Sequence, residues 1–408
     1  MEASRGEKTI CLPFESEAHY EACMRNPEEF RRTLSSLYGR YPELFPARFE
    51  AGFVLDGKRF SERQQLSIRR VVLRATGQKF SIRPSFMLPY MTATTEDVEK
   101  GLYLRHWNVP YDALSHVFGR PPMFWYRAEL ALGRPAIVGT TVKAAERLPA
   151  HLLADEKHTK LLGQKVYVPT VVGGGCILGA TLSEGADAKA LLAAYGEFSS
   201  EARDLSPDYA PETVCTDGWE PTQSAFKTLF EGICVILCFL HSVLKIAERC
   251  VRDQALRSAV LDRAWAVYEA KDRVTFSQRI RRFREWAYTK LPVGSLKEMC
   301  LKLCSKRAQF LKAFDHPAAH RTSNAVDRLI NHLDRRLFAM RTLHGTPASD
   351  RLLIRSVALQ WNFHPYGPRL RCDQPLRRSP FHDLNHFEYH PDWLHNLLIA
   401  SSRGGRRP

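Results

Sequence analysis

The stretch from residue 151 to residue 243 alternates short apolar or β-branched runs with helix-forming runs, and this alternation limits the possible folds more than any other feature of the chain. These runs predict strands at 151–155, 165–172, 176–182, 212–216 and 233–238. They predict helices at 186–203, at 222–230 and from Leu240 onward. The order is three strands, then helix, strand, helix, strand and helix, which predicts a mixed α/β domain.

Three acidic residues lie at the ends of these predicted elements. Asp155 follows a short apolar run, Asp217 ends a β-branched run, and Asp327 opens a helical pattern. The order of elements is that of a ribonuclease-H-like fold, which presents carboxylates at such places, although other mixed α/β folds share it. Three carboxylates suit two Mg²⁺ or Mn²⁺ ions, because these cations prefer oxygen ligands. Two ions about 3.5–4 Å apart stabilise the attacking and the leaving oxygen of a phosphodiester.

The charge of the chain favours a polyanionic partner. The 408 residues contain 59 lysines and arginines against 44 acids, which gives a formal net charge of +15. Phosphate backbones attract such an excess because each neutralised phosphate releases counterions. A solvated basic surface explains the charge equally well, so charge alone identifies no enzyme.

The cysteines and the apolar runs bear on the cellular compartment. The ten cysteines include no Cys-x-x-Cys pair and follow no secretory leader, which predicts reduced thiols in a cytosolic compartment. The most apolar run, 235–243, is about nine residues long, whereas a bilayer takes about 20. We therefore expect no membrane partner, and a location with DNA: the nucleoid in the cytoplasm of a bacterium, or the nucleus of a eukaryote.

At the three acids the chain resembles the Mutator-like transposases, a DDE-type group with bacterial insertion-sequence and eukaryotic members. The acids are 62 and 110 positions apart, Cys238 and His241 match the Cys-x-x-His motif of the group, and residues 322–326 match the approach to its third acid. The departure is Asp327, because the group usually has glutamate there. An aspartate at this position suits either a working triad or a decayed one.

The resemblance implies a DNA transposase that cuts element ends and joins them to target DNA with two Mg²⁺ or Mn²⁺ ions. It would act as a homodimer or higher oligomer on paired ends, and Asp155, Asp217 and Asp327 would be its catalytic residues and metal ligands. The implied fold is a ribonuclease-H-like core with an all-α insertion, preceded by a mainly helical N-terminal region. The parts would be an N-terminal region of unassigned role at 1–90, a DNA-binding domain at 91–148, the catalytic core at 149–243 and 320–370, the insertion at 244–319, and a tail at 371–408.

Three short helical patterns before the catalytic region resemble a helix-turn-helix. They cover 98–107, 111–117 and 121–132, with a tight turn at Gly119. Four apolar residues are expected to pack between the helices: Leu114, Val117, Phe124 and Leu130. Three arginines are expected to face phosphates or base edges: Arg120, Arg127 and Arg134. The alternative is an ordinary helical linker with solvated arginines.

The predicted insertion carries a second basic stretch, in which Arg281, Arg282 and Arg284 alternate with Phe283 and Trp286. Arginines beside such aromatic residues grip phosphates or stack on an exposed base. A solvated face of a helix is the alternative interpretation.

We make further predictions for four single positions and for the C-terminal end. Cys238 and His241 are spaced like half a zinc site, but we favour a structural or DNA-end contact for His241. Trp219 is expected to pack against the insertion or to stack on a flipped base. Asp334, two helical turns after the third acid, is a substitute ligand. The Arg-Gly-rich end, 401–408, is expected to be disordered.

Two other functions compete with an active transposase. One is a catalytically impaired, transposase-derived DNA-binding protein, which the aspartate at the third position supports. The other is a ribonuclease-H-like nuclease that cuts without joining, which the insertion and the upstream helices disfavour.

Overall fold

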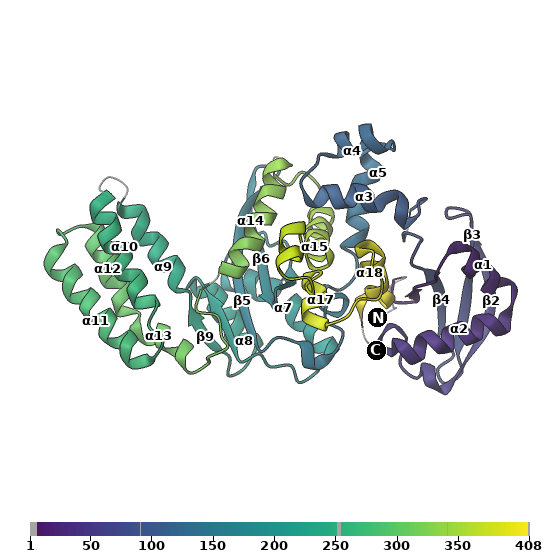
Figure 1. The fold of residues 1–408 in the computed structure, drawn as a ribbon, viewed down its shortest axis with the longest axis horizontal. Coiled ribbons are helices and arrows are strands. Elements are labelled where there is room, and N and C mark those ends of the chain that lie inside the picture. The colour runs from purple at the N-terminus through teal and green to yellow at the C-terminus, as the bar shows by residue number, and fades with distance from the viewer. Residues whose placement is uncertain (1–5, 90, 251–253, 323, 341, 407–408) are drawn as a thin grey trace.

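The computed structural model describes residues 6–406 apart from Tyr90, 251–253, Ser323 and Arg341. The protein is mixed α/β and contains two separate sheets. Its parts lie in a row, with a helical bundle at one end, a five-stranded sheet in the middle and a four-stranded sheet at the other end (Figure 1). Within these described residues, no helix combines the length and the apolar character that a membrane crossing needs.

The central sheet has the strand order β7-β6-β5-β8-β9. Strands β5, β6 and β7 form consecutive antiparallel pairs, whereas β5, β8 and β9 run parallel. The strands are β5 (His151–Leu161), β6 (Gln164–Gly173), β7 (Cys176–Ala180), β8 (Thr213–Thr216) and β9 (Cys234–Leu237). Each strand predicted between 151 and 238 is therefore confirmed. β5 runs beyond its predicted end at Asp155, because residues 156–161 continue the pairing with valine-rich β6.

Helices cover both faces of this sheet. On one face, Leu152, Ala154 and Val214 share a core with α7 (Ala188–Leu205) and α8 (Glu220–Leu229). On the other face, Leu153 and Cys215 belong to a core that includes residues of α14 (Asn324–Ala339) and α15 (Pro347–Phe363). The alternation of side chains along a strand separates the two faces. Residue 155 therefore lies on the α14 face and residue 156 on the α7 face.

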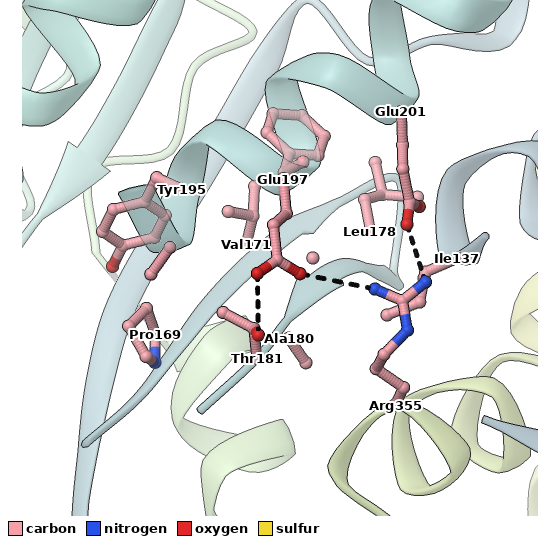
Figure 2. A pocket seen from close by; sticks show the side chains of 13 residues that line it. Ile137, Pro169, Val171, Leu178, Ala180, Thr181, Tyr195, Glu197, Glu201 and Arg355 are labelled. Carbon is pink, nitrogen blue, oxygen red and sulfur yellow. Dashed lines mark hydrogen bonds and ion pairs between the residues drawn. The ribbon is translucent and has the colours of Figure 1, made fainter. Parts of the chain in front are cut away.

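The α15 helix is held to α7 by ion pairs at the β7 edge of the sheet. Arg355 Nη2 donates to Glu201 Oε1 at 2.6 Å, and Arg355 Nη1 lies 3.7 Å from Glu197 Oε2 (Figure 2). The Thr181 hydroxyl also donates to Glu197, at 3.2 Å. The cavity that these side chains line has a volume of about 10 Å³. That volume suits one water molecule, so this place is a packing contact and not a ligand site.

The insertion between β9 and α14 is helical, as predicted. It contains α9 (Phe239–Ala247), α10 (Gln254–Tyr268), α11 (Arg273–Lys290), α12 (Ser295–Ser305) and α13 (Arg307–Leu311). The bundle extends outward from the β9 edge of the sheet (Figure 1). On α11, residues spaced by three or four positions form the buried stripe: Phe276, Ile280, Phe283 and Ala287.

The prediction of a mainly helical N-terminal region is wrong for the first 90 residues. Helices α1 (Glu17–Arg25) and α2 (Pro27–Arg40) accompany a sheet of order β1-β4-β3-β2. Its strands are β1 (Thr9–Leu12), β2 (Phe53–Ser61), β3 (Leu66–Leu73) and β4 (Lys79–Pro84). Arg69 of β3 is buried, and its Nη2 donates to the Met24 carbonyl at 2.9 Å. A buried arginine breaks the apolar alternation that would have indicated the strand.

The three helices predicted before the catalytic region are confirmed. They are α3 (Thr95–His106), α4 (Tyr111–Phe118) and α5 (Pro122–Leu132), and a short α6 (Ile137–Thr141) follows. A capping box between Thr94 and Asp97 begins α3. Val117 is 65% exposed, so its predicted packing is wrong, whereas Leu114 is fully buried.

The predicted disorder of the C-terminal end is wrong for residues 401–406. After α16 (Pro368–Asp373), α17 (Pro380–Asn385) and α18 (Trp393–Ala400), the chain forms a short 3₁₀ helix at Ser402–Gly405. Ser402 donates to the Leu44 carbonyl at 2.8 Å, which fastens this end to the N-terminal region. Gly405 has φ +68°, and an added Cβ would lie 2.2 Å from Thr140 Oγ1. Glycine here permits a close contact, although a run of Arg and Gly is typical of disorder.

Candidate active site

Asp155 lies on β5, and Asp217 directly follows the neighbouring strand β8. In the paired region of β5 and β8, each β8 residue lies 62 positions after its partner, from His151 with Thr213 to Leu153 with Cys215. Asp217 also lies 62 positions after Asp155. In a parallel pair, residues at one level point to the same face, and neighbouring strands are about 4.8 Å apart. The fold thus brings these two predicted site residues to neighbouring positions at the end of β8.

The backbone after β8 holds Asp217 in a tight turn. The Trp219 N–H donates to Asp217 Oδ1 at 2.8 Å, and the Gly218 N–H donates to Thr216 Oγ1 at 3.3 Å. Gly218 has φ +92°, and a Cβ there would lie 2.4 Å from Leu237 Cδ1. Only glycine meets both requirements. The turn therefore fixes the direction of the Asp217 carboxylate.

His241 approaches the same carboxylates from α9. Its Nε2 lies 3.9 Å from Asp155 Oδ2, and the two side chains are 22% and 15% exposed. Cys238, at the start of α9, is buried, and its N–H donates to the Thr216 carbonyl at 2.7 Å. Cys238 therefore has a structural role, whereas the His241 side chain lies next to the Asp155 carboxylate. Within the described chain, these two residues do not belong to a group of three converging metal ligands.

Glu156 is a buried acid that the sequence pattern did not single out. It lies on the opposite face from Asp155, where the hydroxyl groups of Tyr195 and Thr222 both donate to its Oε1. Burial raises the pKa of Glu156 to about 7, and the negative charges of Asp155 and Asp217 add to that rise. The hydrogen bond to Thr222 links β5 to α8, the helix that follows the Asp217 turn. The sequence feature that could have identified Glu156 is an acidic residue at a position where the alternation of the strand directs the side chain into the core.

The third predicted acid is described only in part. Asp327 belongs to α14, but its side chain lies outside the described residues. Asp334, the predicted substitute, forms an ion pair in which its Oδ1 lies 2.6 Å from Lys157 Nζ. This contact places α14 against β5 on the face of the two aspartates.

No model of a known protein family matches this chain, and no curated protein sequence matches it. Its function must therefore be inferred from the chemistry of the site.

One lysine of the insertion, Lys306, interacts electrostatically with Asp217. The pKa of Lys306 is lowered by burial first and then by the positive charges of Lys302 and Lys245, while the negative charge of Asp217 raises it. These residues come from α9, from α12 and from the position that follows α12. The insertion thus adds positive charge beside the carboxylates.

The arginines predicted to bind DNA on the insertion are exposed, but their aromatic neighbours are not. Arg281, Arg282 and Arg284 lie on the outer side of α11. Phe283 is 2% exposed, and the guanidinium of Arg263 covers Trp286 at 4.4 Å from the ring centroid. The helical period directs Phe283 into the core of the bundle and leaves the three arginines on the outer side.

Trp219 does not pack against the insertion. Its ring centroid lies 6.0 Å from Tyr167 and 6.3 Å from His158, on the hairpin of β5 and β6. It also contacts the core on the α7 face of the sheet. The predicted packing partner is therefore wrong.

The arginines predicted on the helix-turn-helix are exposed. Arg120 precedes α5, Arg127 lies within it, and Arg134 follows it. The guanidinium of Arg120 lies 5.2 Å from the Phe124 ring centroid. Helices α4 and α5 project from the body of the protein beside α15 (Figure 1). The structure therefore leaves this face available to a partner.

Proposed function

We propose that this protein is a DNA transposase that uses divalent metal ions to cut element ends and join them to target DNA. The observation that carries the proposal is that Asp155 on β5 and Asp217, one residue after β8, have the same offset of 62 positions as the paired residues of these adjacent parallel strands. Two carboxylates at such a place provide the oxygen donors that Mg²⁺ and Mn²⁺ prefer. Asp155 is 15% exposed, so solvent and a phosphate can reach it.

The strand order supports a ribonuclease-H-like core. A sheet of order β7-β6-β5-β8-β9, with two helices on one face and α14 on the other, matches the fold that the resemblance implies. The helical bundle between β9 and α14 corresponds to the implied insertion. The likeness in architecture is an analogy, so the site must carry the functional proposal.

The direction of α14 supports Asp327 as the third ligand. Asp334 pairs with Lys157, and Leu161 bridges to Leu343 beyond the helix, so α14 and β5 run in the same direction. A helix rises about 1.5 Å per residue and a strand about 3.3 Å. Seven helical residues back from Asp334 cover about 10 Å, and the two strand residues back from Lys157 to Asp155 cover about 7 Å. Position 327 then lies within about 4 Å of the level of Asp155 along the strand.

The residues of the site have distinct roles in this proposal. Asp155 would bridge two ions, with Asp217 holding one and Asp327 the other. When bound, the ions stabilise charge on the attacking and leaving oxygens. His241, whose Nε2 lies 3.9 Å from Asp155 Oδ2, would orient that carboxylate. Lys306, together with the neighbouring Lys245 and Lys302, would attract phosphates of the DNA backbone.

The proposed partner is DNA, bound by basic groups outside the site. Exposed arginines on α11 and beside α5 would contact the backbone of element ends and of target DNA. An oligomer on paired ends follows from the transposase proposal. The place of work would be the nucleoid of a bacterium or the nucleus of a eukaryote.

A cleavage and joining assay tests the proposal. The substrate is a plasmid that carries the DNA flanking the gene, incubated with Mg²⁺ or Mn²⁺. We expect nicked and joined products, and at least about 100-fold less product with Asp155→Asn or Asp217→Asn, since misplacing a reacting group by about 1 Å costs ~10²-fold. Asp262→Asn, a change at an exposed position on α10, is the matched control and should keep full activity.

The same assay separates the two competing functions. Specific DNA binding without any metal-dependent cleavage would support the impaired DNA-binding protein, which the shorter side chain of Asp327 favours. Cleavage without joined products would support the nuclease. Either outcome contradicts an active transposase.

A further inference from the structure

A second cluster of metal-ligating side chains lies in the N-terminal region. His19 and Cys23 are one helical turn apart on α1, and Glu29 lies in the first turn of α2. The ligand atoms of the three side chains all lie within 4.8 Å of one another. The three residues come from two helices, so their convergence is a property of the fold and not of one sequence motif.

The connection between the two helices fixes this convergence. Asn26 both ends α1 and begins α2, and its side chain accepts hydrogen bonds from the N–H groups of Glu28 and Glu29 at 3.0 and 3.3 Å. A one-residue elbow with satisfied caps leaves little freedom between the helices. Glu29 is therefore held near the α1 face that carries His19 and Cys23.

A fourth donor lies next to the cluster. Glu15 Oε2 is 3.7 Å from His19 Nδ1, and the Glu15 side chain is 88% exposed and free to turn. Cys23 is fully buried, with its Sγ 3.6 Å from Thr33 Oγ1. A thiolate, an imidazole and two carboxylates make a complete set for a four-coordinate ion.

We propose that His19, Cys23, Glu29 and Glu15 form a zinc site. Zn²⁺ suits this set because it accepts sulfur, nitrogen and oxygen ligands together, whereas Mg²⁺ takes oxygen. Bonds of about 2.0–2.3 Å place tetrahedral donors about 3–4 Å apart. The exposed Glu29 closes the remaining distance by a change of rotamer.

The proposed ion would clamp the entry to α1, the helix itself and α2. Glu15 and His19 also line a wide cavity of about 890 Å³ between these helices and the C-terminal residues 387–391. A clamp at its edge would stiffen that wall. The site has no residue in common with the aspartates on β5 and β8, so the proposal does not depend on the transposase function.

Metal titration of the full-length protein tests the proposal. After removal of bound metal with a chelator, we expect one Zn²⁺ per chain, and with Co²⁺ as the probe an absorption band from thiolate-to-metal charge transfer. Cys23→Ser should abolish the band. His19→Gln and Glu29→Gln should weaken Zn²⁺ binding by about 100-fold or more, because even changes outside the ligands cost about 10–100-fold.

Two variants make the result decisive. Cys372→Ser removes an exposed thiol on α16 and should keep both the band and the affinity. Glu29 is exposed, so Glu29→Gln tests the site without disturbing the core around the buried Cys23. Wild-type affinity for Zn²⁺ in Glu29→Gln and His19→Gln would overturn the proposal, as would binding of less than one ion per chain by the wild type. Asp217→Asn should bind Zn²⁺ normally, which separates this site from the proposed active site.

Discussion

Replacement of Glu129 by glutamine should destabilise the protein strongly. The Glu129 carboxylate, fully buried on α5, accepts a hydrogen bond from Arg105 Nε at 3.0 Å, from the Tyr111 hydroxyl at 2.6 Å and from Gln360 Nε2 at 3.0 Å. It also pairs with Arg336 of α14. One carboxylate thus joins α3, α4, α14 and α15 to α5, and it is the shared counter-charge of two buried guanidinium groups.

The size of the effect follows from that burial. The Arg105 and Arg336 side chains are each 2% exposed, and burial lowers the pKa of Arg336 well below its usual value. Removing one partner of a buried ion pair costs about 3–5 kcal/mol, because the charge left behind is uncompensated. We therefore expect Glu129→Gln to lower the free energy of unfolding by about 3–5 kcal/mol, out of about 5–15 kcal/mol for a typical domain.

Urea unfolding followed by tryptophan fluorescence measures this loss. Adding Arg336→Met to Glu129→Gln should recover part of the stability, because replacing a buried ion pair with apolar groups is often neutral. Glu285→Gln, at an exposed ion pair with Arg281 on α11, is the control and should change stability by less than about 1 kcal/mol. A loss below about 1 kcal/mol in Glu129→Gln would refute the reasoning about uncompensated buried charge.

Three further predictions concern the turn, the histidines and the arginines. Gly218→Ala should reduce the rate of DNA cleavage at least about 10-fold while the protein still folds. The reason is that the turn needs φ +92° and the added Cβ would clash with Leu237. A wild-type cleavage rate in this variant would contradict the prediction. Burial lowers the pKa values of His332 and His364 to about 4, and His106 stacks on both rings. These depressed values stabilise the fold above about pH 6.5, and that stability should be lost as the pH falls toward 4. His364→Phe should make the free energy of unfolding less dependent on pH between about 6.5 and 4. An unchanged pH dependence would contradict this prediction. Joint replacement of Arg281, Arg282 and Arg284 by alanine should reduce the salt slope of DNA binding by about 3, whereas Arg377→Ala, held by Asp383, should not.

The central sheet was predictable because local residue patterns determine it. Alternating and β-branched runs indicate each strand from β5 to β9, and glycines mark the turns. The separation of 62 positions between Asp155 and Asp217 also contains structural information, because paired residues of β5 and β8 are separated by the same number of positions. That equality could not be recognised before the pairing of β5 with β8 was known.

Long-range contacts explain what the sequence did not indicate. Arg69 points inward on β3 and hides the alternation of that strand, while Gly405 allows an Arg-Gly-rich end to pack against Thr140. In the sequence, Glu129 looks like an ordinary acidic residue of a helix. It is buried only because five helices pack together around it. The proposed zinc ligands likewise depend on the single residue, Asn26, that connects two helices. No local pattern of residues in the sequence indicates these contacts.

The most direct test of the carboxylate site is a crystal of the protein soaked with Mn²⁺, with anomalous scattering used to place the ions. The account predicts two ions about 3.5–4 Å apart, bridged by Asp155, with Asp217 on one and Asp327 on the other. Density for manganese only elsewhere, or an Asp327 carboxylate turned away from the two ions, would contradict the proposed metal-dependent transfer of DNA strands.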